Sequence, residues 1–158
     1  MTSTIFSEKI PLNRWTSIIL GIFIAVLSPL LVLQLFATSR ELTLLVVYAS
    51  MDLFFITVLL NFREQVIEIN SEEIRVSFGL IRKKLLLGDL LSCEPMQARL
   101  GVYGGNGIRL GGDGSLAFLV SMGDAVSLKR KSGRTFVFST MKQVELVKIV
   151  NELIEKES

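Results

Sequence analysis

Two long apolar runs near the beginning of the chain limit its fold more than any other feature. Residues 15–36 contain no charged side chain, and residues 42–62 contain a single one, Asp52. Each run is about 20 residues long, enough for an α-helix to cross a hydrocarbon layer roughly 30 Å thick. The short stretch between them, residues 37–41, is sufficient to turn the chain, so the two runs predict an antiparallel transmembrane hairpin. A cleaved signal peptide is the alternative, but the first run exceeds a usual signal core and the second follows at once.

The hairpin divides the chain into three predicted parts. These are a short N-terminal segment (residues 1–14), the two-helix transmembrane hairpin (15–63) and a domain (64–158). Lys9 and Arg14 precede the hairpin and Arg63 follows it, whereas Arg40 is the only basic residue in the turn. The excess of positive charge on the cytoplasmic side of membrane proteins therefore predicts two spans in the plasma or inner membrane, with both termini cytoplasmic.

The composition argues against several classes of function. The chain has 17 Lys and Arg against 15 Asp and Glu, so it lacks the concentrated positive charge of a nucleic-acid-binding protein. It contains no histidine and one cysteine, Cys93, so the usual general base, zinc ligand and Ser–His or Cys–His pairs are missing. We therefore expect no enzymatic activity, no metal and no cofactor.

Asp52 lies near the middle of the second apolar run, where a carboxyl group is costly and is a candidate for function. Tyr48 precedes it by one helical turn, and Ser28 of the first run should lie at a similar depth. One interpretation is structural, with the carboxyl bonded to such hydroxyls and locking the helix pair or an oligomer. The other is a proton or ion relay. Gly21, Ala25 and Ser28 also form a stripe of small residues that permits close helix approach.

From residue 64 the pattern changes to short β-type runs separated by turns. Apolar residues alternate in 66–69 and 74–78 around the polar turn 70–73, which predicts a β-hairpin. Residues 82–87 and 90–93 predict another strand pair, or one strand bent around Gly88 and Asp89, ended by Pro95. Further segments are predicted at 104–110, 116–121, 125–131 and 134–139. The last segment predicts an amphipathic helix, with Thr140 and Gln143 at the spacing of a capping box. About seven antiparallel strands and one helix predict a small all-β barrel capped by a C-terminal α-helix. A Greek-key sandwich is the alternative.

This order of elements resembles the pleckstrin-homology (PH) superfold, and the whole chain resembles membrane-anchored bacterial PH-like proteins. The resemblance is carried by the hairpin followed by residues 103–109 (YGGNGIR), 125–129 (AVSLK) and 132–134 (SGR). Such proteins are expected to carry an aromatic residue in the glycine-rich segment, where this chain has Asn106. The resemblance implies a PH-like fold and a membrane location, and it implies no defined activity.

The domain contains several candidate binding residues. Arg82, Lys83 and Lys84 form one basic cluster, and Lys129, Arg130 and Lys131 form another, with Arg134 nearby. Either cluster would suit an anionic membrane surface or form an ordinary solvated strand face. Arg109 follows the glycine-rich segment and would pair with a carboxylate or project as a binding residue. A strand follows these glycines where a nucleotide fingerprint requires a helix, so we expect no nucleotide site.

These features predict a membrane-anchored binding or scaffolding module that presents a PH-like domain at the cytoplasmic membrane face. The expected partners are the bilayer and either another protein or further copies of this chain. Phosphoinositides are not expected. PH domains that bind them use a basic loop between the first two strands, whereas the loop predicted there, residues 70–73, is acidic and would repel a phosphorylated headgroup. The alternative is an accessory subunit of a membrane complex or transporter, in which Asp52 is an intramembrane contact or relay residue.

Overall fold

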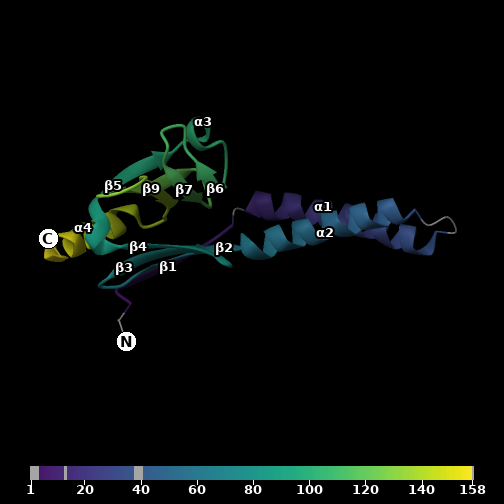
Figure 1. Cartoon of the computed structure of the whole chain (residues 1–158), viewed down its shortest axis with the longest axis horizontal. Coiled ribbons are helices and arrows are strands. Elements are labelled where there is room, and N and C mark those ends of the chain that lie inside the picture. Colours follow the sequence, from purple (N-terminus) through teal and green to yellow (C-terminus); the bar gives the residue numbers. More distant parts are fainter. Residues whose placement is uncertain (1–3, 13, 38–40, 158) are drawn as a thin grey trace. The chain divides into compact units, whose positions relative to one another are not determined.

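The structure, a computed structural model, describes residues 4–12, 14–37 and 41–157 (Figure 1). It divides into two units: residues 1–11 together with 64–158, and residues 12–63. The second unit consists of helices α1 (Arg14–Phe36) and α2 (Leu42–Asn61). Both helices are long and apolar enough to cross a membrane, judged by length and composition. The rings of Phe23 and Phe55 stack between them, with centroids 5.0 Å apart.

The described residues of the first unit form nine strands in two sheets, and β1 precedes α1. Strand order in the four-stranded sheet is β1-β2-β3-β4, all antiparallel. The five-stranded sheet has the order β5-β8-β9-β7-β6, in which β7 and β9 are parallel. The bounds are β1 Phe6–Pro11, β2 Glu64–Ile69, β3 Glu73–Phe78, β4 Ile81–Leu86, β5 Leu90–Ala98, β6 Gly107–Leu110, β7 Leu116–Leu119, β8 Gly123–Arg130 and β9 Phe136–Ser139.

Three short elements complete this unit. The 3₁₀ helix η1 (Leu87–Asp89) joins β4 to β5, helix α3 (Leu100–Tyr103) follows β5, and helix α4 (Gln143–Glu157) ends the described chain. Figure 1 shows the two sheets as separate layers with α4 at one end of the pair. The prediction of about seven antiparallel strands closed into a barrel is therefore corrected to nine strands in two mostly antiparallel sheets, while the helix that follows the strands is confirmed.

The predicted β-hairpin over β2 and β3 is confirmed, and its turn has an identifiable cause. The side-chain Oδ1 of Asn70 accepts hydrogen bonds from the backbone N–H groups of Glu72 and Glu73, at 2.9 and 2.7 Å. This arrangement is typical of asparagine in turns. Inward and outward residues alternate along both strands, which leaves Ile67, Ile69, Ile74 and similar residues buried.

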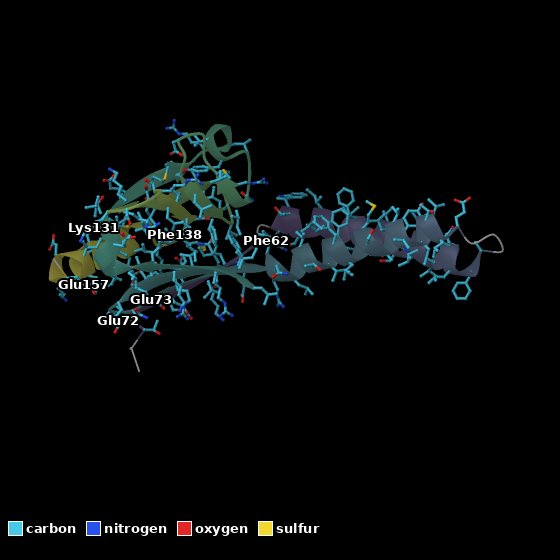
Figure 2. The ribbon with its side chains drawn as sticks, in the orientation of Figure 1. Phe62, Glu72, Glu73, Lys131, Phe138 and Glu157 are labelled. Atoms are coloured by element: carbon cyan, nitrogen blue, oxygen red, sulfur yellow. The ribbon has the colours of Figure 1, made fainter. Side chains whose placement is uncertain are left out.

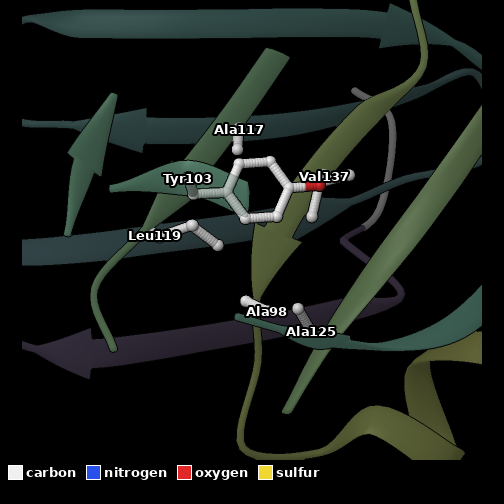
Figure 3. Packing of buried hydrophobic residues seen from close by; sticks show 6 residues of the cluster. All are labelled: Ala98, Tyr103, Ala117, Leu119, Ala125 and Val137. Carbon is white, nitrogen blue, oxygen red and sulfur yellow. The ribbon is translucent and has the colours of Figure 1, made fainter. Parts of the chain in front are cut away.

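The core lies between the sheets and continues onto the second face of the five-stranded sheet. Figure 2 shows Phe138, which is fully buried, within the layer of side chains between the sheets. On the other face, the Tyr103 ring of α3 lies over small and branched residues (Figure 3). These residues are Ala98, Ala117, Leu119, Ala125 and Val137. The Tyr103 hydroxyl and Ser115 Oγ lie 3.1 Å apart and share a hydrogen bond, which satisfies the buried polar group.

The prediction of a separate N-terminal segment over residues 1–14 is also corrected. Within that segment β1 pairs with β2 along its whole length, from Phe6 opposite Ile69 to Pro11 opposite Glu64. The apolar hairpin is therefore an insertion between the first two strands. The loop 70–73 was predicted to join the first two strands, but it joins β2 to β3 because β1 lies before the hairpin.

Two local predictions were wrong. β5 does not end at Pro95 but runs to Ala98. Proline has no N–H to donate to a neighbouring strand, and β5 tolerates this because it is an edge strand with one unpaired side. Thr140 and Gln143 do not form a capping box. Gln143 Nε2 instead donates to the carbonyl oxygens of Met96 and Ala125, at 2.8 and 2.7 Å.

Candidate functional site

Asp52 faces the other helix of the hairpin. Its side chain is 6% exposed, and Oδ1 has no hydrogen-bond partner within the described part of the chain. Tyr48 and Ser28 are both half-buried, as the predicted contact would require. Neither hydroxyl forms a hydrogen bond with Oδ1 of Asp52, however. Around its depth the half-buried or buried residues include Leu20, Gly21, Ile24, Leu27, Ser28 and Leu31 on α1, and Leu45, Tyr48, Asp52, Phe55 and Val58 on α2. The carboxyl group thus belongs to the seam of its own hairpin.

The predicted stripe of small residues is divided between two surfaces of α1. Gly21 and Ser28 are half-buried, whereas Ala25 is exposed. A Cβ placed on Gly21 would meet no atom within 4 Å among the described residues, so glycine is not required there for the two helices to approach.

The first basic cluster lies on β4, at the edge of the four-stranded sheet. Lys83 is opposite Val76, a buried inward residue, so it points to the inner side of the sheet. Arg82 and Lys84 point outward because side chains alternate along a strand. Lys84 Nζ lies 3.7 Å from Glu73, which Arg75 also contacts at 2.6 Å. Part of this cluster is thus an ordinary solvated ion-pair network.

The second cluster, at the end of β8, is also divided. Lys129 Nζ donates to Glu94 at 2.6 Å, and this hydrogen bond holds the pKa of Glu94 below its usual value. Arg130 donates through Nε and Nη2 to Asp89 Oδ2, at 2.9 and 2.5 Å, and these bonds lower the pKa of Asp89. Lys131 is exposed, and its backbone N–H donates to the carbonyl oxygen of Asp89.

Residues from both clusters meet at one pocket of about 250 Å³. Its lining comprises Lys83, Leu116, Arg130, Arg134 and Phe136. Lys83 comes from β4, Arg130 from the end of β8, and Arg134 from the loop that leads into β9. Within the described residues, neither Lys83 nor Arg134 has an ion-pair partner, and no acidic residue lines the pocket. The pocket therefore combines an apolar floor with a cationic rim.

Arg109 is not among the residues that line this pocket. It is exposed on β6, and its Nε donates to the carbonyl oxygen of Asn106 at 3.0 Å. The side chain folds back over its own glycine-rich turn, where Gly104, Gly105 and Gly107 all have positive φ. These glycines form the turn between α3 and β6.

The free edge of β5 is partly occupied. The Asn151 side chain of α4 accepts from the backbone N–H of Cys93 and donates to its carbonyl oxygen, each at 3.0 Å. Two residues further on, Pro95 has no N–H to offer. An open hollow of about 550 Å³ adjoins this edge, lined by Pro95, Met96, Gln97, Arg99, Val102, Asp113 and Gln143. Strand addition at this part of β5 therefore lacks the backbone donors that it needs.

Cys93 is buried, and burial raises the pKa of its thiol to about 12, with the adjacent Glu94 carboxylate adding to the rise. Such a thiol is a poor nucleophile at neutral pH. Within the described residues, no group of three or more His, Cys, Asp or Glu side chains could hold a metal ion.

No family model matches this chain, and no curated protein sequence matches it either.

Proposed function

We propose that the chain is a membrane-anchored binding module, with the α1–α2 hairpin as its anchor and a PH-like β domain as its binding part. The observation that carries this proposal is the insertion of the apolar hairpin between the paired strands β1 and β2. Pro11 is paired with Glu64, and the Leu12 N–H donates to the Arg63 carbonyl oxygen at 2.9 Å. Only two residues join β1 to α1, and two join α2 to β2, so the anchor and the domain share two short connections.

Charge supports a cytoplasmic location for the domain. Lys9 lies on β1, and Arg14 and Arg63 flank the helices at the end of the hairpin that continues into the strands. The positive-inside rule places this end in the cytoplasm. The PH-like assignment is supported by the consecutive four-stranded sheet, the second sheet and the helix that follows the strands.

Labelling of single cysteines tests this topology. In a Cys93→Ala background, we expect Glu41→Cys, next to the hairpin turn, to react with a membrane-impermeant maleimide on intact cells. Glu72→Cys, in the exposed β2–β3 turn, should react only after the cells are permeabilised, because the turn would lie in the cytoplasm. Labelling of Glu72→Cys on intact cells, or release of the protein by alkaline carbonate, would contradict the proposal.

A second function is an accessory subunit of a membrane complex. The observation that favours it is Oδ1 of Asp52, which finds no hydrogen-bond partner among the residues that the structure describes. We expect Asp52→Asn to leave every associated protein in place, because the carboxyl faces the other helix of the same hairpin. Native mass spectrometry of the intact protein, released gently from its own membranes, measures this. Replacing the whole hairpin with an unrelated one is the stronger variant. If either change removes a defined second protein, the subunit role replaces the anchoring role.

A further inference from the structure

The cationic pocket between β4 and the loop before β9 has the chemistry of a specific anion site. We propose that it binds a phosphate monoester that carries an apolar group, with Lys83, Arg130 and Arg134 holding the phosphate and Leu116, backed by the buried Phe136, contacting the apolar part. The inference deepens the proposed function, because it names the ligand class of the binding module.

The charge of the pocket fits a dianion. Lys83, Arg130 and Arg134 contribute three positive charges, and Asp89, bonded to Arg130, removes one, which leaves two. A phosphate monoester carries a charge of about −1.5 to −2 at neutral pH, and its oxygens are strong acceptors for guanidinium and ammonium groups. A carboxylate would neutralise only half of this charge.

One of the three cations is fixed in place before any ligand arrives. Asp89 holds Arg130 through two hydrogen bonds, and Ser132 Oγ donates to the other oxygen of Asp89 at 3.1 Å. A Cβ on Gly133, whose φ is +87°, would stand 3.2 Å from Arg130 Nη1. Glycine therefore both permits the turn and leaves room for the guanidinium. Such fixed groups lower the entropy lost on binding.

The size and floor of the pocket limit the organic part of the ligand. Its volume of about 250 Å³ is below the range of roughly 300–1,000 Å³ usual for sites that hold drug-sized molecules. Phe136 is 1% exposed and is firmly packed against Phe118, with ring centroids 5.2 Å apart. The floor is thus rigid and apolar, and it suits a small apolar group beside the phosphate.

Two sources could supply this chemistry: the headgroup of an anionic phospholipid and a soluble phosphate ester. The full chain in phosphatidylcholine nanodiscs is titrated with phenyl phosphate, and the dissociation constant is measured by calorimetry. In parallel, nanodiscs containing phosphatidic acid are analysed by native mass spectrometry for retained lipid. Binding of phenyl phosphate alone assigns a soluble ligand, whereas retained phosphatidic acid assigns the lipid headgroup.

A pair of double variants makes the test specific. We expect Lys83→Gln with Arg134→Gln to weaken binding at least tenfold, because it removes two charge-assisted contacts. The control, Lys84→Gln with Lys129→Gln, removes the same charge from β4 and β8 outside the pocket and should change binding less than twofold. Slow alkylation of Cys93 verifies that both variants are folded.

The proposal is overturned if neither ligand binds, or if both double variants weaken binding equally, which would indicate a diffuse charge effect. Its failure is distinct from failure of the membrane topology, because binding is measured in nanodiscs and topology in cells. A chain that binds phenyl phosphate but labels in the opposite orientation would keep the pocket and lose the cytoplasmic location.

Discussion

Replacing Phe118 by alanine is expected to destabilise the β domain by about 3–5 kcal/mol, the usual cost of removing a buried aromatic ring. Phe118 is 3% exposed and joins the two sheets, since its ring lies 5.7 Å from that of Phe78 in β3 and 5.2 Å from that of Phe136 in β9. The total stability of a domain is only about 5–15 kcal/mol. This single change therefore removes a large part of the free energy that holds the sheets together.

Alkylation of Cys93, the single cysteine of the chain, measures this loss of stability. Cys93 is 2% exposed and its pKa is about 12, so it alkylates slowly until the domain opens. We expect the urea midpoint for alkylation of the full chain in detergent to fall sharply in Phe118→Ala. Val144→Ala, at an 82% exposed position on α4, is the control and should keep the midpoint of the unchanged protein. Equal midpoints for the two variants would show that the sheets do not depend on this ring.

Replacing Glu8 by alanine is expected to cost about 3 kcal/mol, because its carboxylate makes two hydrogen bonds away from water. The side chain is 8% exposed and points inward from β1. Oε2 accepts from Thr140 Oγ1 at 2.6 Å, and Oε1 accepts from the Met141 N–H at 3.0 Å. The substitution leaves the buried Thr140 hydroxyl and the partly buried Met141 N–H without their acceptor, and it loosens the segment that leads into α4.

The same alkylation assay measures this effect in the full chain. Lys9→Ala, at the neighbouring exposed position of β1, is the matched control and should leave the midpoint unchanged. Thr140→Val completes a double-mutant cycle with Glu8→Ala. The two losses should overlap because they remove the same bond; strictly additive losses would mean that Glu8 and Thr140 are not coupled.

Strands with regular alternation could be predicted, whereas those that depend on distant partners could not. β2 and β3 show apolar residues at every second position around a turn residue, Asn70, so local sequence determines them. β1 has glutamate at an inward position, which breaks the apolar alternation. Glu8 is accommodated only because Thr140 and Met141, more than 130 residues away in sequence, supply its donors.

The arrangement of the sheets was beyond local reasoning for a related reason. The parallel pairing of β7 with β9 joins Leu116 to Phe136, with all of β8 between them in sequence. Short apolar strands have no local signal for their neighbour or its direction. Counting strands therefore predicted a barrel, and the structure has two open sheets.

The basic clusters were identified from sequence, but their meeting point was not. Neighbouring basic residues looked equivalent, yet alternation sends Lys83 inward and Lys84 outward along the same strand. The opposite directions of Lys83 and Lys84 follow from this alternation once the register of β4 is known. The approach of Arg130 and Arg134 to Lys83 depends on the packing of one sheet against the other, which no local pattern encodes.

The insertion of the hairpin between β1 and β2 sets an order for the synthesis of this protein. The ribosome makes β1 before the hairpin, but β2 emerges only after residues 12–63. At translation rates of roughly 5–20 residues per second, the first strand remains without its partner for several seconds. During this time both helices must leave the ribosome, and the four-stranded sheet can be completed only after α2 has been made. If α1 and α2 enter the bilayer as proposed, their insertion and the closure of the domain are steps of one process. A ribosome that stalls within α2 then leaves β1 without its partner strand.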